Sequence, residues 1–274
     1  MLFMTQKSSK IQQQYQGYLQ TPLLWNENPL FELHQLILPE IPTTIFCRSL
    51  PENLRLGKRV EHFVFNELSQ YNSIKLLAEN IQIQDDYRTI GELDLFALNH
   101  ENPIHVEIVY KFYIYDDTVG NSYLEHWIGP NRKDSLVEKL TKLRDKQLPL
   151  LYRKETQTAL NNLQLHVNNT KQYVYFKAQL FLPLGTQEVT ETLINKDCIV
   201  GYYIKTKQLE QFHHCKFYIL NKADWLIKPH TNVNWMSYSA CFTLLHAAQN
   251  NQLSECCWIK HPNGVIDKCF VVWW

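Results

Sequence analysis

Residues 89–116 read TIGELDLFALNHENPIHVEIVYKFYIYD, and this stretch decides the fold. Two runs rich in β-branched and aromatic residues flank the polar segment 99–103, a pattern typical of an antiparallel pair of strands. Single charges stand among the apolar residues: Asp94 in the first run, Glu107 in the second and Lys111 four residues later. Such charges need either solvent or a function.

Side chains alternate along a strand, so Glu107, Val109 and Lys111 share one face. If the two runs pair as a hairpin, Asp94 and Glu107 stand side by side. Carboxylates that close repel each other unless a cation bridges them or one holds a proton. Their hard oxygen ligands predict a Mg²⁺ or Mn²⁺ site at Asp94 and Glu107. A strand face turned toward water gives the same alternation, so that interpretation stays open.

Regular structure is expected on both sides of this hairpin. Residues 54–71 predict a helix, with Val60, Val64 and Leu68 at helical spacing, and residues 74–84 predict a further strand. A second helix is expected from an N-cap at Asn131 to Pro149, followed by a strand over residues 173–185. Strands, a helix and another strand in this order predict an α/β (α+β) fold, with a mixed β-sheet flanked by helices.

The two ends of the chain predict extensions of this core. Residues 11–50 resemble short helices broken by prolines. The C-terminal part predicts strands at 199–206 and 216–227, a helix at 238–249 and a hairpin around the Asn-Gly pair at 263–264. Because no linker composition interrupts the chain, we expect a single domain over 1–274, with a helical extension (1–50), a core (51–185) and a β-rich C-terminal extension (186–274) packed on the core.

Composition limits the class of protein. The 274 residues are 45% hydrophobic with a formal net charge of zero, so any attraction to nucleic acid must be local. The sequence has no secretory signal and no apolar run that predicts a membrane span, which excludes a membrane partner. Seven irregularly spaced cysteines are typical of reduced thiols, so we expect a cytoplasmic location.

The second predicted helix is locally basic. Residues 132–154 contain eight Lys or Arg and three Asp or Glu, a surplus of five positive charges. Such a surface can follow a phosphate backbone, although a solvated helix face has the same composition. Gln147 continues the apolar row of the helix inward, so its amide needs a partner. The candidate nucleic-acid contacts are Arg132, Lys133, Lys139, Lys142 and Gln147.

Other clusters favour packing over chemistry. His213, His214 and Cys215 are consecutive, as are Cys256 and Cys257, and consecutive strand residues point to opposite faces. Neither set has the spacing of a zinc site. The C-terminal tryptophans could stack on bases, but packing in the core is the simpler interpretation.

The order of these elements and charges resembles the restriction-endonuclease-like, or PD-(D/E)XK, nuclease superfamily. The resemblance implies a core in which a helix carries Glu61, a strand meander carries Asp94 and Glu107, and Lys111 follows. It implies Mg²⁺-dependent hydrolysis of phosphodiesters, with Asp94 and Glu107 as ligands, Lys111 stabilising the transition state and Glu61 positioning water or a second metal.

A closer resemblance is to the bacterial family named domain of unknown function 1853, which is grouped with that superfamily. The stretches YLQTPLLW, LGKRVEHF, GELDLF, HVEIVYKFYI, WIGPN and LNKADWLIKP are similar to that family in the same order. One departure is the lysine: the superfamily's acid and lysine are two residues apart, whereas Glu107 and Lys111 are four apart, roughly 13 Å along a strand. The rival hypotheses are a catalytically inactive module of the same fold that binds nucleic acid or protein, and a structural partner in an assembly.

Overall fold

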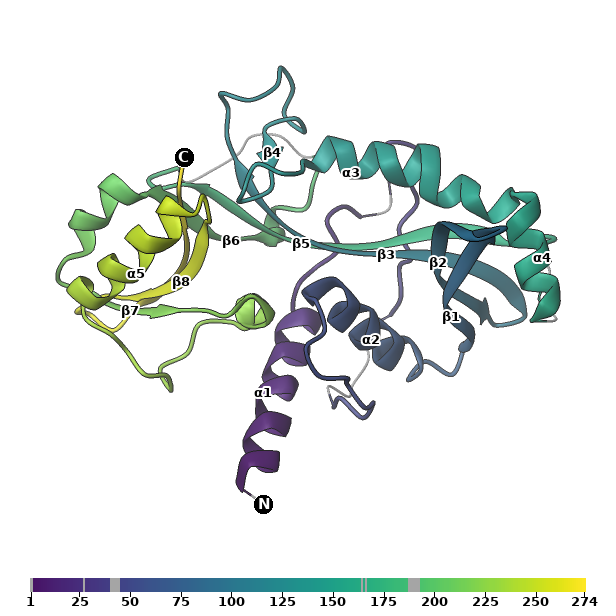
Figure 1. Cartoon of the computed structure of the whole chain (residues 1–274), viewed down its shortest axis with the longest axis horizontal. Helices are drawn as coiled ribbons and strands as arrows, with labels where there is room; N and C mark the ends of the chain where they lie inside the picture. The colour runs from purple at the N-terminus through teal and green to yellow at the C-terminus, as the bar shows by residue number, and fades with distance from the viewer. Residues whose placement is uncertain (1, 27, 40–44, 164, 166, 187–192) are drawn as a thin grey trace.

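One large mixed sheet organises the molecule (Figure 1). The computed structural model describes residues 2–26, 28–39, 45–163, 165, 167–186 and 193–274. The sheet order is β1-β2-β3-β5-β6-β9-β8-β7, and β4 pairs beside β3. The strands are β1 Ile74–Asp85, β2 Arg88–Asn99, β3 Asn102–Tyr115, β4 Trp127–Ile128, β5 Lys171–Pro183, β6 Ile199–Lys205, β7 Lys216–Ile219, β8 Glu255–Lys260 and β9 Ile266–Val272.

The direction of the strands changes across the sheet. β1, β2 and β3 form the predicted antiparallel meander, and β3, β5, β6 and β9 then run parallel to one another. β8 and β7 return to antiparallel pairing at the other end. Ladders therefore run without a break from the first strand to the C-terminal hairpin.

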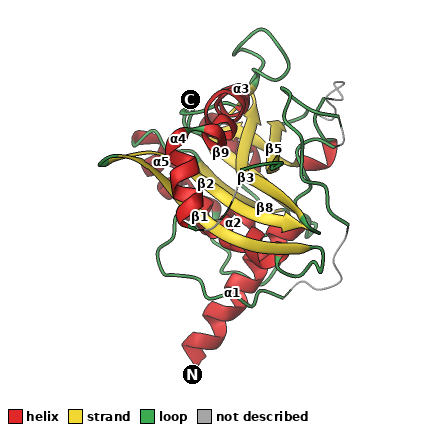
Figure 2. Ribbon diagram, turned by 90° about the vertical axis from the view of Figure 1, so that its right-hand side faces the viewer, coloured by secondary structure: helices red, strands yellow, loops and turns green. Residues whose placement is uncertain are grey.

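Helices cover both faces of the central strands (Figures 1 and 2). α1 and α2 lie on one face, and α3 and α4 lie on the other, while α5 packs beside β7. The helices are α1 Leu2–Leu19, α2 Leu56–Leu68, α3 Leu136–Lys142, α4 Lys154–Asn162 and α5 Tyr238–Asn250. A π-helical turn, Leu143–Gln147, and a 3₁₀ turn, Leu148–Tyr152, continue α3.

Apolar side chains explain why β3 lies in the middle. Its Val106 and Tyr110 pack with Phe63 of α2 in one core cluster, and its Val109 packs with Leu140 of α3 in another. With both faces covered, Glu107 is 0% exposed. The interpretation of this strand face as solvated is therefore wrong at Glu107.

Several predicted elements are confirmed, and others differ. The helix at 54–71, the strand at 173–185, the helix at 238–249 and the C-terminal hairpin are present. In place of short helices after residue 11, α1 ends at Leu19, and the described residues from there to α2 contain no helix. The helix expected from Asn131 begins later, because Ser135 is the N-cap and forms a capping box with Glu138. Only Lys216–Ile219 of the predicted 216–227 strand forms a strand, and Lys222–Leu226 is a 3₁₀ turn.

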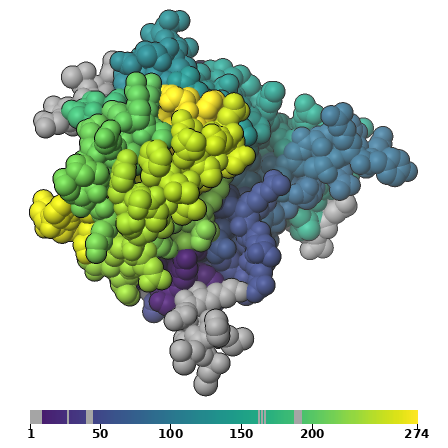
Figure 3. Space-filling model, turned by 60° about the vertical axis from the view of Figure 1, so that its left-hand side comes forward, coloured from purple at the N-terminus to yellow at the C-terminus, as the bar shows by residue number. Residues whose placement is uncertain are grey.

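The hairpin of β1 and β2 projects from the body of the molecule (Figure 3). In this view the hairpin, coloured blue, points away from the C-terminal residues, coloured green to yellow. Within the described part of the chain, no helix has both the length and the apolar character needed to cross a bilayer.

Candidate metal and phosphate site

The site forms where β2 and β3 part. Their ladder ends with Leu95 opposite Val106, and Asp94 follows at the point where the pairing stops. The Oδ2 atom of Asp94 accepts a hydrogen bond from the backbone N–H of Ile108 at 2.8 Å. This carboxylate takes the place of a strand partner for Ile108, and the β2–β3 ladder does not continue past Leu95 toward the β1–β2 turn.

Four carboxylates meet at this point, and we call Glu61, Glu92, Asp94 and Glu107 the acid cluster. Single oxygen atoms of Glu61, Glu92 and Asp94 lie within 4.8 Å of one another. Glu107 stands close enough for its charge to raise the pKa values of Asp94 and Glu61. The structure thus brings together the three predicted acids and adds Glu92.

Lys58 is the cation on the α2 side of the cluster. Its Nζ atom lies 2.8 Å from Glu61 Oε2 and also contacts Glu92 and the side-chain oxygen of Asn80. Lys58 and Glu61 are neighbours on one face of α2 because they are three residues apart. The Lys58 side chain is 42% exposed, so the cluster reaches solvent on this side.

Glu107 is held from two directions. Gln172 donates to Nδ1 of His105 at 2.9 Å, so the other ring nitrogen, Nε2, carries the proton and donates to Glu107 Oε1 at 3.1 Å. The amide of Gln147 donates to the second oxygen of Glu107. Each oxygen keeps a lone pair, so these bonds orient the carboxylate and leave it able to bind a cation.

Lys139 brings a second ammonium to the cluster from the opposite face of the sheet. Its Nζ atom donates to Gln147 Oε1 at 2.7 Å, although the two residues are eight apart. The π-helical turn Leu143–Gln147 rotates the end of the helix, so both side chains point toward Glu107. Lys139, Gln147 and Glu107 therefore form one hydrogen-bonded chain.

Burial and repulsion shift the protonation of the site. Burial, followed by the charge of Glu107, raises the pKa of Asp94 to about 8. Burial lowers the pKa of Lys139 to about 8, although Glu107 and Asp94 act against this shift. Burial also raises the pKa of Glu61, with Lys58 opposing it. Near neutral pH the site therefore has one carboxyl and one amine that exchange protons readily.

Lys111 lies apart from the acid cluster. Its Nζ atom is 2.6 Å from Asp134 Oδ2, at the entry to α3, and both side chains are about one third exposed. Because Lys111 is four residues from Glu107 along the strand, its ammonium pairs with Asp134 and not with Glu107. Lys139 occupies the place beside Glu107 that the sequence had assigned to Lys111.

The remaining predicted nucleic-acid contacts do not form a single surface. The guanidinium of Arg132 lies 3.8 Å above the ring of Trp274 and pairs with Asp116. Lys133 and Lys142 are exposed. Lys139 and Gln147 face the acid cluster, so the predicted set divides between the site, the surface and a packing contact.

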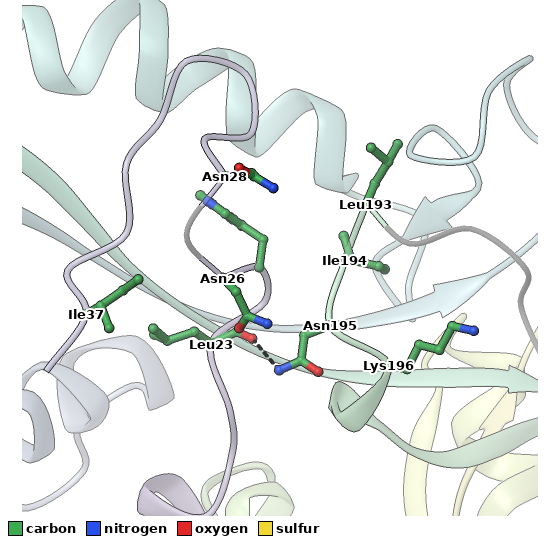
Figure 4. A pocket seen from close by; sticks show the side chains of 9 residues that line it. Leu23, Asn26, Asn28, Ile37, Leu193, Ile194, Asn195 and Lys196 are labelled. Atoms are coloured by element: carbon green, nitrogen blue, oxygen red, sulfur yellow. Dashed lines mark hydrogen bonds between the residues drawn. The ribbon is translucent and has the colours of Figure 1, made fainter. Parts of the chain in front are cut away.

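A hollow of about 700 Å³ lies elsewhere, between residues 23–37 and residues 193–196 (Figure 4). Asn195 lines this hollow and donates from Nδ2 to the backbone oxygen of Leu23 at 3.2 Å. Lys196 points away from Asn26 and Asn28. None of its described lining residues is a carboxylate, so this hollow carries none of the chemistry predicted from the sequence.

Two members of the site were not among the predicted residues. Glu92 shares a strand face with Asp94 in the GELD stretch, so its period-two spacing was the available signal. Gly91, the residue before Glu92, lets the 3₁₀ turn Leu148–Tyr152 pack closely against β2. A Cβ atom at position 91 would lie 2.5 Å from Leu150 Cδ2. Lys58 precedes Glu61 by one helical turn, and this spacing could have identified it.

The comparisons with known proteins give a family and no activity. A family model described as Domain of unknown function (DUF1853) matches residues 4–268. No curated protein and no solved structure matches the chain significantly. The matched range includes every residue of the acid cluster, as well as Lys58, Lys139 and Gln147, and extends over nearly the whole sequence. The chain therefore belongs to the DUF1853 family.

Proposed function

We propose that this chain is a metal-dependent nuclease that hydrolyses phosphodiester bonds in DNA or RNA. The observation that carries the proposal is the surplus of negative charge in the acid cluster, where Glu61 and Glu107 are buried and Glu92 and Asp94 are half-buried. Four carboxylates face two ammonium groups, those of Lys58 and Lys139. Buried charge of one sign is costly unless a cation or a proton offsets it, so the cluster suits a divalent ion.

The residues fit a hard cation. Mg²⁺ and Mn²⁺ prefer carboxylate oxygens and bind few protein ligands, keeping positions for water and a phosphate. Asp94, Glu61 and Glu92 have oxygen atoms near enough to share one ion, and Glu107 adds the oriented carboxylate beside them. When bound, the ion would supply positive charge to the scissile phosphate and to the attacking water.

The chain's own groups have distinct parts in this proposal. Lys139 places an ammonium beside the phosphate, where it offsets developing charge and can return a proton to the leaving oxygen. Gln147 holds Lys139 and Glu107 at a fixed separation. Glu61 reaches the cluster from α2 and orients the attacking water. Lys111 has no part in this chemistry, because it pairs with Asp134.

The arrangement of elements supports placing the chain in the PD-(D/E)XK superfamily. A helix that carries Glu61 is followed by an antiparallel meander with Asp94 and Glu107, then by a helix and a strand parallel to β3. This is the order that the sequence resemblance implies. The departure is the origin of the lysine, which comes from α3 and not from the acid-bearing strand.

A second candidate is a module of the same fold that binds nucleic acid without cleaving it. The position of Lys58 favours this candidate, since one ammonium already bridges Glu61 and Glu92. Because of this ion pair, the charges of Glu61 and Glu92 are partly offset without a metal ion. The two candidates differ in one property, the saturable binding of a divalent ion.

The test is calorimetric titration of Mg²⁺ and Mn²⁺ into the full chain and into an Asp94→Asn/Glu107→Gln double variant. Asp145→Asn is the matched control, because this acid is exposed and pairs with Arg144. Each protein is then incubated with labelled single- and double-stranded DNA and RNA. We expect metal binding and cleavage in the wild type and in the control, and neither in the double variant. Nucleic-acid binding without metal binding or cleavage would favour the inactive module.

A further inference from the structure

A second group of reactive side chains lies at the C-terminal end of the sheet. Cys215 is in the turn before β7, His261 follows β8, and Asp267 is in β9. The Sγ atom of Cys215 is 3.6 Å from Nδ1 of His261, and Nε2 of the same ring is 2.7 Å from Asp267 Oδ2. A thiol, an imidazole and a carboxylate are therefore connected in series.

The hydrogen bonds fix the tautomer of the ring. A carboxylate only accepts, so Nε2 of His261 carries the proton and donates to Asp267. Nδ1 is then left with a lone pair that faces the thiol of Cys215. Tyr202 also donates to Asp267 Oδ2, at 3.1 Å, and so holds the carboxylate. This is the tautomer that a general base next to a nucleophile requires.

The surroundings distinguish Cys215 from the other thiols. Among the described cysteines it is the one whose sulfur has an imidazole partner; Cys198, for example, faces backbone oxygens. Cys215 is 8% exposed, whereas the His261 and Asp267 side chains are 28% and 32% exposed, so solvent reaches the group from the imidazole side. Burial and then the charge of Asp267 raise the pKa of the Cys215 thiol, so it rests protonated and needs a base in order to react.

We propose that Cys215 is a nucleophile, with His261 as its general base and Asp267 as the positioning residue, and that it accepts acyl groups from activated esters. In the step, the Cys215 sulfur forms a bond to the acyl carbon, and the bond from that carbon to the ester oxygen breaks. The thiol proton moves to His261 Nδ1 and then to the departing oxygen. The products are an S-acyl cysteine and an alcohol. This site is independent of the acid cluster.

The first test compares two cysteines in one molecule. Cys47 is exposed, so accessibility alone predicts that iodoacetamide alkylates it faster than Cys215. With an adjacent base we expect the opposite order at pH 7, by at least about tenfold, measured for each site by peptide mass spectrometry. His261→Gln should slow Cys215 by about 100-fold and leave Cys47 unchanged. A rate at Cys215 below that of Cys47, or one unaffected by His261→Gln, would overturn the proposal.

The second test concerns acyl transfer and the role of Asp267. With p-nitrophenyl acetate we expect one equivalent of nitrophenolate in a burst and an acetyl group on Cys215, both lost in Cys215→Ser and retained in Cys47→Ser. Asp267→Asn replaces the carboxylate that accepts from Nε2 of His261, so the burst should slow, and Asp267→Glu, which again offers a carboxylate, should recover most of the rate. A burst that is equally slow in both variants would show that Asp267 is only structural, and the absence of acetylation at Cys215 would refute the acyl assignment.

Discussion

Helix α2 carries two buried glutamates with opposite surroundings. Glu67 is 5% exposed and accepts hydrogen bonds from the hydroxyls of Tyr18 and Tyr175. The buried ammonium of Lys177 lies 4.6 Å from the Tyr18 ring and interacts electrostatically with Glu67. Glu61 also has one ammonium partner, Lys58, but it shares this partner with Glu92 and lies among other carboxylates. On the same helix, six residues apart, one glutamate has donors that offset its charge and the other has further carboxylates as neighbours.

The difference shows what distinguishes a structural acid from a candidate site. At Glu67 one negative charge meets one buried ammonium and two hydroxyl donors, so its charge is offset without a bound cation. In the acid cluster the carboxylates outnumber the ammonium groups by four to two, and burial, followed by the charge of Glu107, raises the pKa of Asp94. Burial alone is therefore a poor criterion for function, whereas an uncompensated surplus of buried charge is a better one.

The strongest test of this comparison removes the ammonium of Lys139. Replacing Lys139 with Met removes the ammonium next to Glu107, and we expect cleavage of nucleic acid to fall about 10²- to 10³-fold. Lys142→Met is the matched control, since Lys142 is on the same helix and is exposed. Initial rates at saturating Mn²⁺ measure both. Equal losses in the two variants would mean that the helix provides only a general basic surface.

The next largest effect concerns the protonation of Asp94. Its pKa is raised to about 8 in the folded chain, above the ordinary value near 4, so the folded state binds more protons between these values. Stability of the metal-free protein is then highest below about pH 4 with respect to this group and falls as the pH rises to 8. Asp94→Asn lacks this loss, so it should become more stable than the wild type by on the order of 5 kcal/mol at pH 8.

Urea denaturation at pH 5, 6.5 and 8 in the presence of a chelator measures this difference. The advantage of Asp94→Asn should grow with pH, and Mg²⁺ should reduce it by stabilising only the wild type. An advantage that is constant with pH would contradict the raised pKa of Asp94.

Glu67 should respond in the opposite direction. Glu67→Gln replaces an acceptor of two hydroxyl bonds with an amide, which leaves at least one buried donor or the Lys177 charge without its partner. We expect a loss of about 1–2 kcal/mol in the free energy of unfolding. The same substitution at Glu61 should cost less or stabilise the chain, because it relieves repulsion. Chemical denaturation of the two variants at pH 7 compares them directly, and equal losses would erase the distinction between the two glutamates.

Much of this architecture was predictable because it depends on local pattern. Alternation predicted the meander, and its pairing predicted that Asp94 and Glu107 would come together. The position of Lys139 beside Glu107 was not predictable in the same way. Lys139 reaches the site from α3, and its alignment with Gln147 depends on the π-helical turn that follows this helix. Period-3.6 reasoning places Gln147 inward but does not foresee that turn. The start of that helix was missed since Asn131 accepts a hydrogen bond from Ser254 N, more than 120 residues away.

The smallest expected effect concerns Lys111. Its bond to Asp134 joins two side chains that are each about one third exposed, and exposed pairs contribute about 0–1 kcal/mol. Lys111→Met should therefore leave cleavage within about twofold and change the free energy of unfolding by less than about 1 kcal/mol. Assays of Lys111→Met beside Lys139→Met measure this. If Lys111→Met lost as much cleavage as Lys139→Met, Lys111 would have to leave Asp134 in the substrate complex and reach back along β3. The ammonium would then come from the acid-bearing strand, and Lys139 would serve mainly to hold Gln147 against Glu107.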